Sequence, residues 1–157
     1  MVSGTFVSGN RCVGLNQYHM EWAPKYRKAI MVDGVKVAIE QSFVQTSQLY
    51  KISIHAMEVD DDHVHLFVSI PFDMSASKAL QLLKGRSAYD VFRTFPWLRE
   101  QFKKGHFWSP GKFCRSISNV TSGAIYGYIR GHQGRKLNET ILAAKMEIDQ
   151  LRLSSFF

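Results

Sequence analysis

The sequence is poor in cysteine and has no long apolar run. Cys12 and Cys114 are its two cysteines among 157 residues, too few and too far apart to define a disulfide framework or a thiolate metal site. This usage is typical of a reducing compartment, and we expect a cytoplasmic protein. No eighteen apolar residues follow one another, and the first fifteen residues lack a basic segment followed by an apolar core. We therefore expect neither a membrane span nor a secretion signal.

Internal repeats, low-complexity tracts and linkers rich in Pro or in Gly and Ser are also missing. The length suits one compact domain, and 45% hydrophobic residues with 13% aromatics are enough to build its core. Intrinsic disorder is thereby excluded as the main state. We predict a flexible N-terminal tail over 1–10 and a single domain over 11–157.

Acidic residues are scarce relative to basic ones, and the imbalance is local. The chain has 20 Lys and Arg against 13 Asp and Glu, a formal charge of +7. Between Lys78 and Lys136 we count twelve basic residues against Asp90 and Glu100, so the rest of the chain is slightly acidic. Such a concentration favours a polyanionic partner, above all nucleic acid, although solvated helix faces also collect Lys and Arg.

Hydrophobic periodicity predicts an α+β fold. Alternation of apolar and polar residues indicates strands, and apolar residues at helical spacing indicate helices, with Asp33 as a candidate cap. The predicted strands cover 15–22, 51–59, 63–70 and 112–118, and the predicted helices cover 35–49, 75–92, a segment from 119 or 121 through 128, and 138–153. The order β, α, β, β, α, β followed by helices matches the split βαβ, ferredoxin-like pattern with an antiparallel sheet. Fold alone does not decide the function.

Two histidines are the first candidates for chemistry. His63 and His65 are two residues apart on a predicted strand, so both rings point to one face, about 7 Å apart along the strand, and can share a cation. The motif also arises by chance in a chain with six histidines. The neighbouring Val64 and Leu66 would supply the buried face, and we expect the histidines on the opposite, exposed face.

A tyrosine and a histidine form the second candidate group. Tyr128 and His132 are four residues apart on a predicted helix, about 40° apart around its axis, so both can face one site. Gln133 lies about 140° from Tyr128 and reaches that site only if Gly131 loosens the last turn. Spacing alone favours the interpretation of Tyr128 as an ordinary core tyrosine with its hydroxyl at the edge.

Four blocks of sequence carry a family resemblance, and together they span most of 15–135. The segment EVDDDHVHLFVSIPFDMSASKALQLLKGRSA (58–88) resembles the HUH segment of the single-tyrosine transposases of insertion sequences that move as single-stranded DNA. Three more segments resemble the family's other signature blocks and occur in the same order: QYHMEWAPKYRK (17–28), FWSPGKFCRSI (107–117) and YIRGHQ (128–133).

The resemblance implies a ferredoxin-like homodimer in which each active site is completed by the partner subunit. His63 and His65 match the metal ligands, and Tyr128 matches the nucleophile that forms a 5′-phosphotyrosine link with DNA. The family pattern has Gln four residues after this tyrosine, where this chain has His132, with Gln133 one further on. We expect His132 as the third ligand, with Gln133 as the alternative. The ion would be Mg²⁺ or Mn²⁺, and imidazole ligands should accept Mn²⁺ at least as well.

Basic residues from the second predicted helix onwards are the candidate contacts to a DNA hairpin. We expect phosphate contacts above all from Lys78, Lys84, Arg86, Lys112 and Arg115, and further ones from Arg93, Arg99, Lys103 and Lys104. Trp97, Phe107 and Trp108 either stack on unpaired bases or pack in the core. Asp60, Asp61 and Asp62 are interpreted as the turn before the HUH strand and not as ligands. Two other functions share these features: a non-catalytic stem-loop-binding protein, and a nickase of the replication-initiator type.

Overall fold

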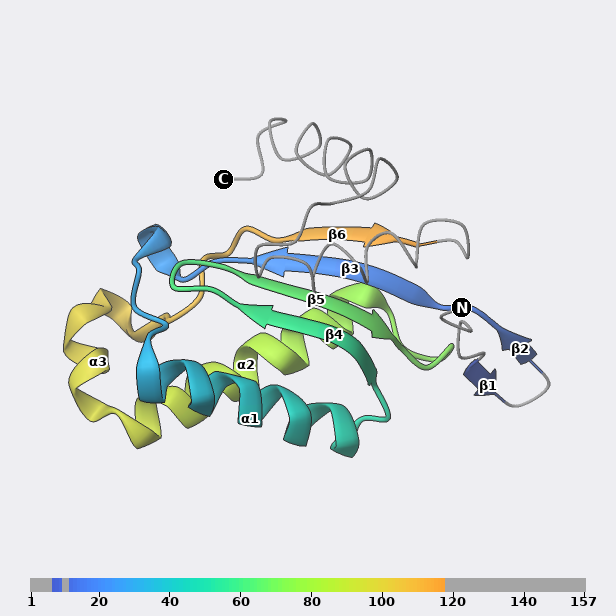
Figure 1. Ribbon diagram of the computed structural model, residues 1–157, viewed down its shortest axis with the longest axis horizontal. Helices are drawn as coiled ribbons and strands as arrows, with labels where there is room; N and C mark the ends of the chain where they lie inside the picture. The colour runs from blue at the N-terminus through green and yellow to red at the C-terminus, as the bar shows by residue number, and fades with distance from the viewer. Residues whose placement is uncertain (1–6, 10–11, 118–157) are drawn as a thin grey trace, which may run out of the picture.

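The computed structural model describes residues 7–9 and 12–117. Its centre is a four-stranded antiparallel sheet with the order β4-β5-β3-β6. The strands are β3 (Gln17–Trp22), β4 (Ser53–Val59), β5 (Val64–Ser69) and β6 (Phe113–Ser116). The two inner strands, β3 and β5, pair over six residues from Gln17↔Ser69 to Trp22↔Val64. Figure 1 shows these four strands as one layer above the helices.

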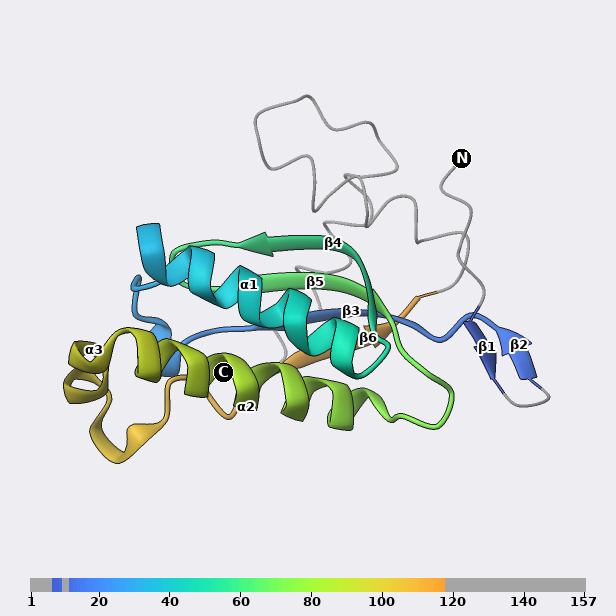
Figure 2. The same ribbon diagram turned by 90° about the horizontal axis from the view of Figure 1, so that it is seen from below.

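Two long helices cover one face of the sheet. They are α1 (Asp33–Leu49) and α2 (Ala76–Thr94), which lie side by side, below the strands in Figure 1 and in front of them in Figure 2. The short helix α3 (Pro96–Gln101) follows α2, and single 3₁₀ turns cover Lys25–Arg27 and Lys103–Gly105. None of the helices in the described part of the chain is both long enough and apolar enough to cross a membrane.

The core lies between the sheet and these helices. Alternate residues of the inner strands point into it, among them Met20 and Trp22 from β3 and Leu66 from β5, all with no exposed surface. Ile39 and Leu83 fill the space from the two helices. Because successive strand residues point to opposite faces, the intervening residues of β3 and β5 face away from the helices. The helices thus leave a second face of the sheet for polar residues.

The predicted fold class is confirmed, and the predicted strands and the first two helices agree with the structure within a few residues at each end. Asp33 is the first residue of α1 rather than its cap, a position that Val32 occupies, whereas Ser75 caps α2 by accepting a hydrogen bond from the Lys78 backbone N–H. Helix α3 was not predicted, because six residues are too few to show a helical period. The two helices predicted beyond 118 lie outside the described residues.

The N-terminal part of the chain differs from the predicted tail. Val7–Gly9 forms strand β1, which pairs antiparallel with β2 (Cys12–Gly14) in a small separate ribbon at one end of the molecule. Three residues within the tail predicted over 1–10 are therefore strand. So short a pair shows little alternation of apolar and polar residues in the sequence, and its partner strand gives it its structure.

Trp97, Phe107 and Trp108 were expected either to pack in the core or to stack on DNA bases. Two of these three residues belong to the core. Phe107 and Trp108 are 1% and 6% exposed, and the Trp108 indole N–H donates to Ser87 Oγ at 2.9 Å. Ser87 in turn donates to the Leu83 carbonyl of α2, so the buried indole is joined to the helix backbone. Trp97, on α3, is instead 52% exposed.

Lys84 links α2 by hydrogen bonds to the segment that leads into β6. Its ammonium donates to the carbonyl oxygens of Ser109 at 2.7 Å and Gly111 at 3.4 Å. Burial, together with the smaller effect of the positive charge of Lys112, lowers the pKa of Lys84 to about 8. Lys84 was predicted to contact phosphate, and these two hydrogen bonds hold its amine against the protein's own backbone.

We expect Lys84 to titrate near pH 8, well below a solvated lysine. Because its folded pKa lies below the unfolded value of 10.5, the folded state disfavours the ammonium form. Below about pH 8 the buried ammonium therefore lowers the free energy of unfolding by its full amount. This destabilisation disappears as the pH rises from about 8 toward 10.5. NMR titration of ¹³C-methylated lysines checks this, with Lys84→Arg to assign the signal. Titration of that signal together with the exposed lysines would contradict it.

Candidate metal and strand-cleavage site

The two HUH histidines stand at the start of β5. His63 directly precedes the strand and His65 is its second residue. Their ring centroids are 4.9 Å apart and the ring planes are nearly perpendicular, at 86°. The strand's alternation brings both rings to the face of the sheet away from α1 and α2, as expected from the sequence. Two imidazoles are thus adjacent on the sheet face away from α1 and α2.

Two carboxylates of the preceding turn hold the ring of His63. Its Nδ1 lies 2.6 Å from Asp62 Oδ1, and its Nε2 lies 3.0 Å from Asp60 Oδ2. The hydrogen bond with His63 is the main cause that lowers the pKa of Asp62. The turn residues therefore do more than reverse the chain, because they fix the orientation of the histidine that follows.

His65 is buried, which corrects the expectation of an exposed pair. Its side chain is 1% exposed, whereas that of His63 is 18% exposed. Because β5 is an inner strand, residues of both β3 and β4 lie beside His65. In the sheet register His65 stands opposite Glu21 on one side and Glu58 on the other. Its Nδ1 lies 3.2 Å from His19 Nε2 and 3.8 Å from Glu21 Oε2.

The described residues supply two donors suited to a divalent ion. These are the imidazoles of His63 and His65, since imidazole nitrogens bind Mn²⁺ and later metals well, and the carboxylate of Asp60 lies 3.0 Å from His63 Nε2. Within the residues that the structure describes, His, Cys, Asp and Glu side chains form no complete group of three arranged as a metal site. The donor set fits a cation that takes its remaining ligand from elsewhere. Tyr128, His132 and Gln133, the other predicted site residues, lie outside the described residues.

His19 and Glu21 belong to this site, and sequence reasoning did not select them. They alternate with Tyr18, Met20 and Trp22, so the sequence places them together on one face of the first predicted strand. Both are buried, at 0% and 1% exposed. The sequence feature that could have identified them is a histidine and a carboxylate on the same polar face of one strand. Their approach to His65 required knowing that β3 pairs with β5.

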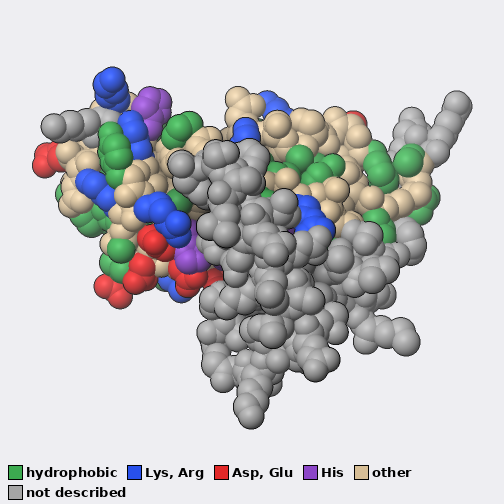
Figure 3. Space-filling model, turned by 90° about the horizontal axis from the view of Figure 1, so that it is seen from above, with side chains coloured by type: hydrophobic (Ala, Val, Ile, Leu, Met, Phe, Trp, Pro, Cys, Tyr) green, Lys and Arg blue, Asp and Glu red, His purple; other side chains and the backbone are tan. Residues whose placement is uncertain are grey.

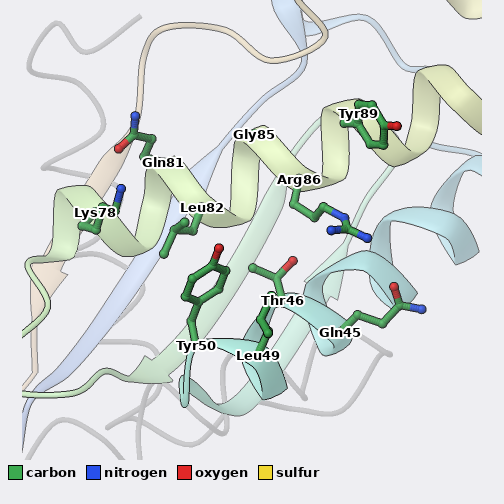
Figure 4. Close-up of a pocket in the computed structure, with 10 residues that line it drawn as sticks. All are labelled: Gln45, Thr46, Leu49, Tyr50, Lys78, Gln81, Leu82, Gly85, Arg86 and Tyr89. Carbon is green, nitrogen blue, oxygen red and sulfur yellow. The ribbon is translucent and has the colours of Figure 1, made fainter.

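The predicted DNA contacts fall on two sides of the sheet. Arg115 stands opposite His19 on β6, which brings it to the histidine face, and Lys112 is exposed just before β6. Lys78 and Arg86 instead lie on α2, where they line a groove of about 710 Å³ between α1 and α2 (Figure 4). Arg86 is also paired there with Asp90, Nε to Oδ2 at 3.0 Å. The structure therefore does not gather the five basic residues into one patch.

The molecular surface shows the same mixed character. On the face seen in Figure 3, Lys and Arg side chains lie next to acidic side chains and histidine at one end of the molecule. The concentration of positive charge read from the sequence thus does not produce a purely basic surface there. A polyanion at this end would meet carboxylates as well as cations, an arrangement that divalent ions make favourable.

Comparison with known proteins gives the chain its family. The family described as "Transposase IS200 like" matches residues 12–132. Among similar proteins, the ISDra2 transposase TnpA of Deinococcus radiodurans is 28% identical over 120 residues, which cover 76% of this chain and 86% of that protein. The transposase for insertion sequence element IS200 of Salmonella typhimurium is 28% identical over 117 residues, 74% of this chain and 76% of that one.

Solved structures agree with this family. A crystal structure of a protein from Deinococcus radiodurans R1 assigned as a transposase superposes with a TM-score of 0.66 at 28% identity, covering 82% of this chain and 98% of that one. A REP-associated tyrosine transposase bound to a REP hairpin shares the fold, with a TM-score of 0.56 at 14% identity over 78% of this chain and 69% of that one. The family's enzymes cleave DNA strands and transfer them. With its matched span, its sheet and its paired histidines, this chain belongs to the IS200-like transposase family.

Proposed function

We propose that the protein cleaves and rejoins single-stranded DNA at the ends of an insertion sequence, with Tyr128 as nucleophile and a divalent ion, Mg²⁺ or Mn²⁺, bound by His63 and His65. The observation that carries this proposal is the pair of adjacent imidazoles, 4.9 Å apart between ring centroids, on the face of the sheet away from α1 and α2 in a chain of this transposase family. His132, or alternatively Gln133, would supply the third ligand.

The chain's residues have separable tasks in this reaction. Tyr128 contributes the attacking oxygen: the new bond joins its phenolic oxygen to phosphorus, the phosphorus–O3′ bond breaks, and the phenolic proton goes by way of solvent to the leaving 3′-hydroxyl. When bound, the cation would polarise the scissile phosphate and neutralise its charge. Asp62, 2.6 Å from Nδ1, would hold the ring of His63 while its Nε2, beside Asp60, faces the cation. Because the phosphotyrosine keeps the energy of the phosphodiester bond, a second 3′-hydroxyl can reverse the step and join new DNA.

The DNA partner in this proposal is a single strand whose ends fold into hairpins. Support comes from the fold shared with a REP-associated transposase bound to a REP hairpin, and from the chain's excess of positive charge. Arg115 and Lys112 are the predicted phosphate contacts on the side of the histidines, and Lys78 and Arg86 are those on the helical side. A hairpin that touches both groups must extend around the edge of the sheet.

Tyr128→Phe is expected to abolish covalent attachment to single-stranded DNA and to leave hairpin binding within about twofold, because the substitution removes only the attacking oxygen. Labelled oligonucleotide carrying the element's end, denaturing gels for the adduct and filter binding for affinity measure the two effects. Tyr126→Phe is the matched control. An adduct that persists in Tyr128→Phe and disappears in Tyr126→Phe would place the nucleophile at Tyr126. If the wild-type protein binds the hairpin but forms no adduct, the non-catalytic binding function is favoured instead.

Cleavage should require a divalent ion and should be lost in His63→Ala and in His65→Ala. Removing a ligand should weaken Mn²⁺ binding by at least the roughly 10–100-fold that loss of an outer partner costs. Isothermal titration with Mn²⁺ and cleavage assays with and without EDTA test this, with the exposed His106→Ala as control. For the third ligand, His132→Ala should weaken binding more than Gln133→Ala, and the reverse order would assign Gln133. Full activity in excess EDTA would refute the metal.

We further propose a homodimer in which the histidines of one subunit work with Tyr128 of the other, since one tyrosine holds one cleaved strand and excision must hold two ends. Co-expressing a His63→Ala, His65→Ala double variant with Tyr128→Phe should then restore up to about half of the wild-type cleavage, because one composite site per heterodimer is intact. Differently tagged chains, purified in sequence, confirm that heterodimers form. Heterodimers without cleavage would refute assembly between subunits, and a monomer by light scattering would remove its premise.

A further inference from the structure

A histidine on the neighbouring strand contacts the metal-site histidine from the side. His19, on β3, places its Nε2 3.2 Å from Nδ1 of His65 on β5, 46 residues away in sequence. The two rings are nearly parallel, with 4° between their planes and 5.4 Å between their centroids, so the contact runs edge to edge within a shared plane. Both side chains are buried, at 0% and 1% exposed.

The contact determines which nitrogen of His65 can face a cation. An imidazole that binds a metal through one nitrogen carries its proton on the other. Because Nδ1 of His65 points at His19, the nitrogen available for coordination is Nε2, and Nδ1 must then carry the proton and donate to His19 Nε2. Glu21 Oε2, 3.8 Å from the same Nδ1, adds a negative charge that favours a proton there.

We propose that His19 is a positioning residue of the strand-cleavage site: by accepting the Nδ1–H of His65 it fixes the tautomer and ring orientation in which Nε2 binds the divalent ion. The inference rests on the proposed metal-dependent function and adds a residue to it. His19 is not part of the apolar core cluster, which contains its neighbours Met20 and Trp22, so its buried ring lies on the polar face of the sheet beside His65.

The size of the effect follows from how outer partners act on metal ligands. Without an acceptor at His19, His65 populates both tautomers and several ring orientations, and the fraction ready to bind falls. Loss of such a partner typically lowers metal affinity about 10–100-fold. An amide oxygen can take the place of the His19 nitrogen as acceptor, so glutamine should preserve much of the effect, whereas leucine of similar volume should not.

Three variants separate this role from general stability. His19→Leu removes the acceptor, and His19→Gln keeps one. Ser69→Ala is the matched control, because Ser69 is a buried polar residue at the far end of β5, the strand that carries His65. Its hydroxyl lies 2.6 Å from His55 Nε2. The readouts are the His65 tautomer by ¹⁵N NMR in metal-free protein, Mn²⁺ affinity by isothermal titration at one fixed pH, and urea unfolding.

The expected result has three parts. Metal-free wild-type protein shows His65 protonated at Nδ1. His19→Leu mixes the tautomers and weakens Mn²⁺ binding about 10–100-fold, while His19→Gln and Ser69→Ala stay within about threefold of wild type. A wild-type His65 protonated at Nε2 would overturn the proposal without any variant, even if His19→Leu fails to fold. Wild-type Mn²⁺ affinity in folded His19→Leu would overturn it and leave the proposed function standing. Absence of Mn²⁺ binding by wild type would instead refute the proposed metal, whatever the tautomer.

Discussion

The pairing of β3 with β5 is the constraint on which the site depends. Its register sets Glu21 opposite His65 and, two residue pairs further along, His19 opposite Phe67. A shift by one residue would turn every side chain of β3 to the other face, carrying His19 and Glu21 into the apolar core and Met20 and Trp22 out of it. The core contacts of Met20 and Trp22 therefore maintain the polar contacts of His19. Packing on one face and chemistry on the other are fixed by the same six residue pairs.

Burying polar groups beside His65 is costly, and the sheet offsets this cost by pairing them. An imidazole or carboxylate removed from water without a hydrogen-bond partner loses about 1–3 kcal/mol or more. Here His19 meets His65, and His55 meets Ser69 four residues further along β5. The helical side is filled mainly by apolar side chains such as Ile39 and Leu83, and the buried Trp108 indole there is paired with Ser87. The polar face is thus specified by hydrogen bonds, whose geometry is more demanding than that of apolar packing.

Local patterns in the sequence predicted the elements well and the burial of the site poorly. Alternation identified the strands that became β3 and β5, and apolar residues at helical spacing identified the helix that became α2, whose buried residues include Ala79, Leu83 and Val91. The HUH spacing was enough to bring His63 and His65 to one face. Periodicity says nothing of strand order, however, so it could not show that β5 is an inner strand or that His65 is buried. The contacts of His19 with His65 and of Lys84 with Ser109 join residues 46 and 25 positions apart, which no local pattern encodes.

The turn between β4 and β5 has a further consequence for how such a chain can vary. Hairpin turns at a protein surface commonly accept insertions and deletions. This one is tied down, because the Asp61 carbonyl accepts hydrogen bonds from the backbone of both Ile30 and Met31 at 3.0 Å, and the Asp60 backbone N–H donates to the His63 carbonyl at 2.9 Å. An added residue would break these bonds and rotate His63 away from its carboxylates. The length of this surface turn is therefore constrained by the position of His63, and we expect insertions and deletions in other loops of the fold.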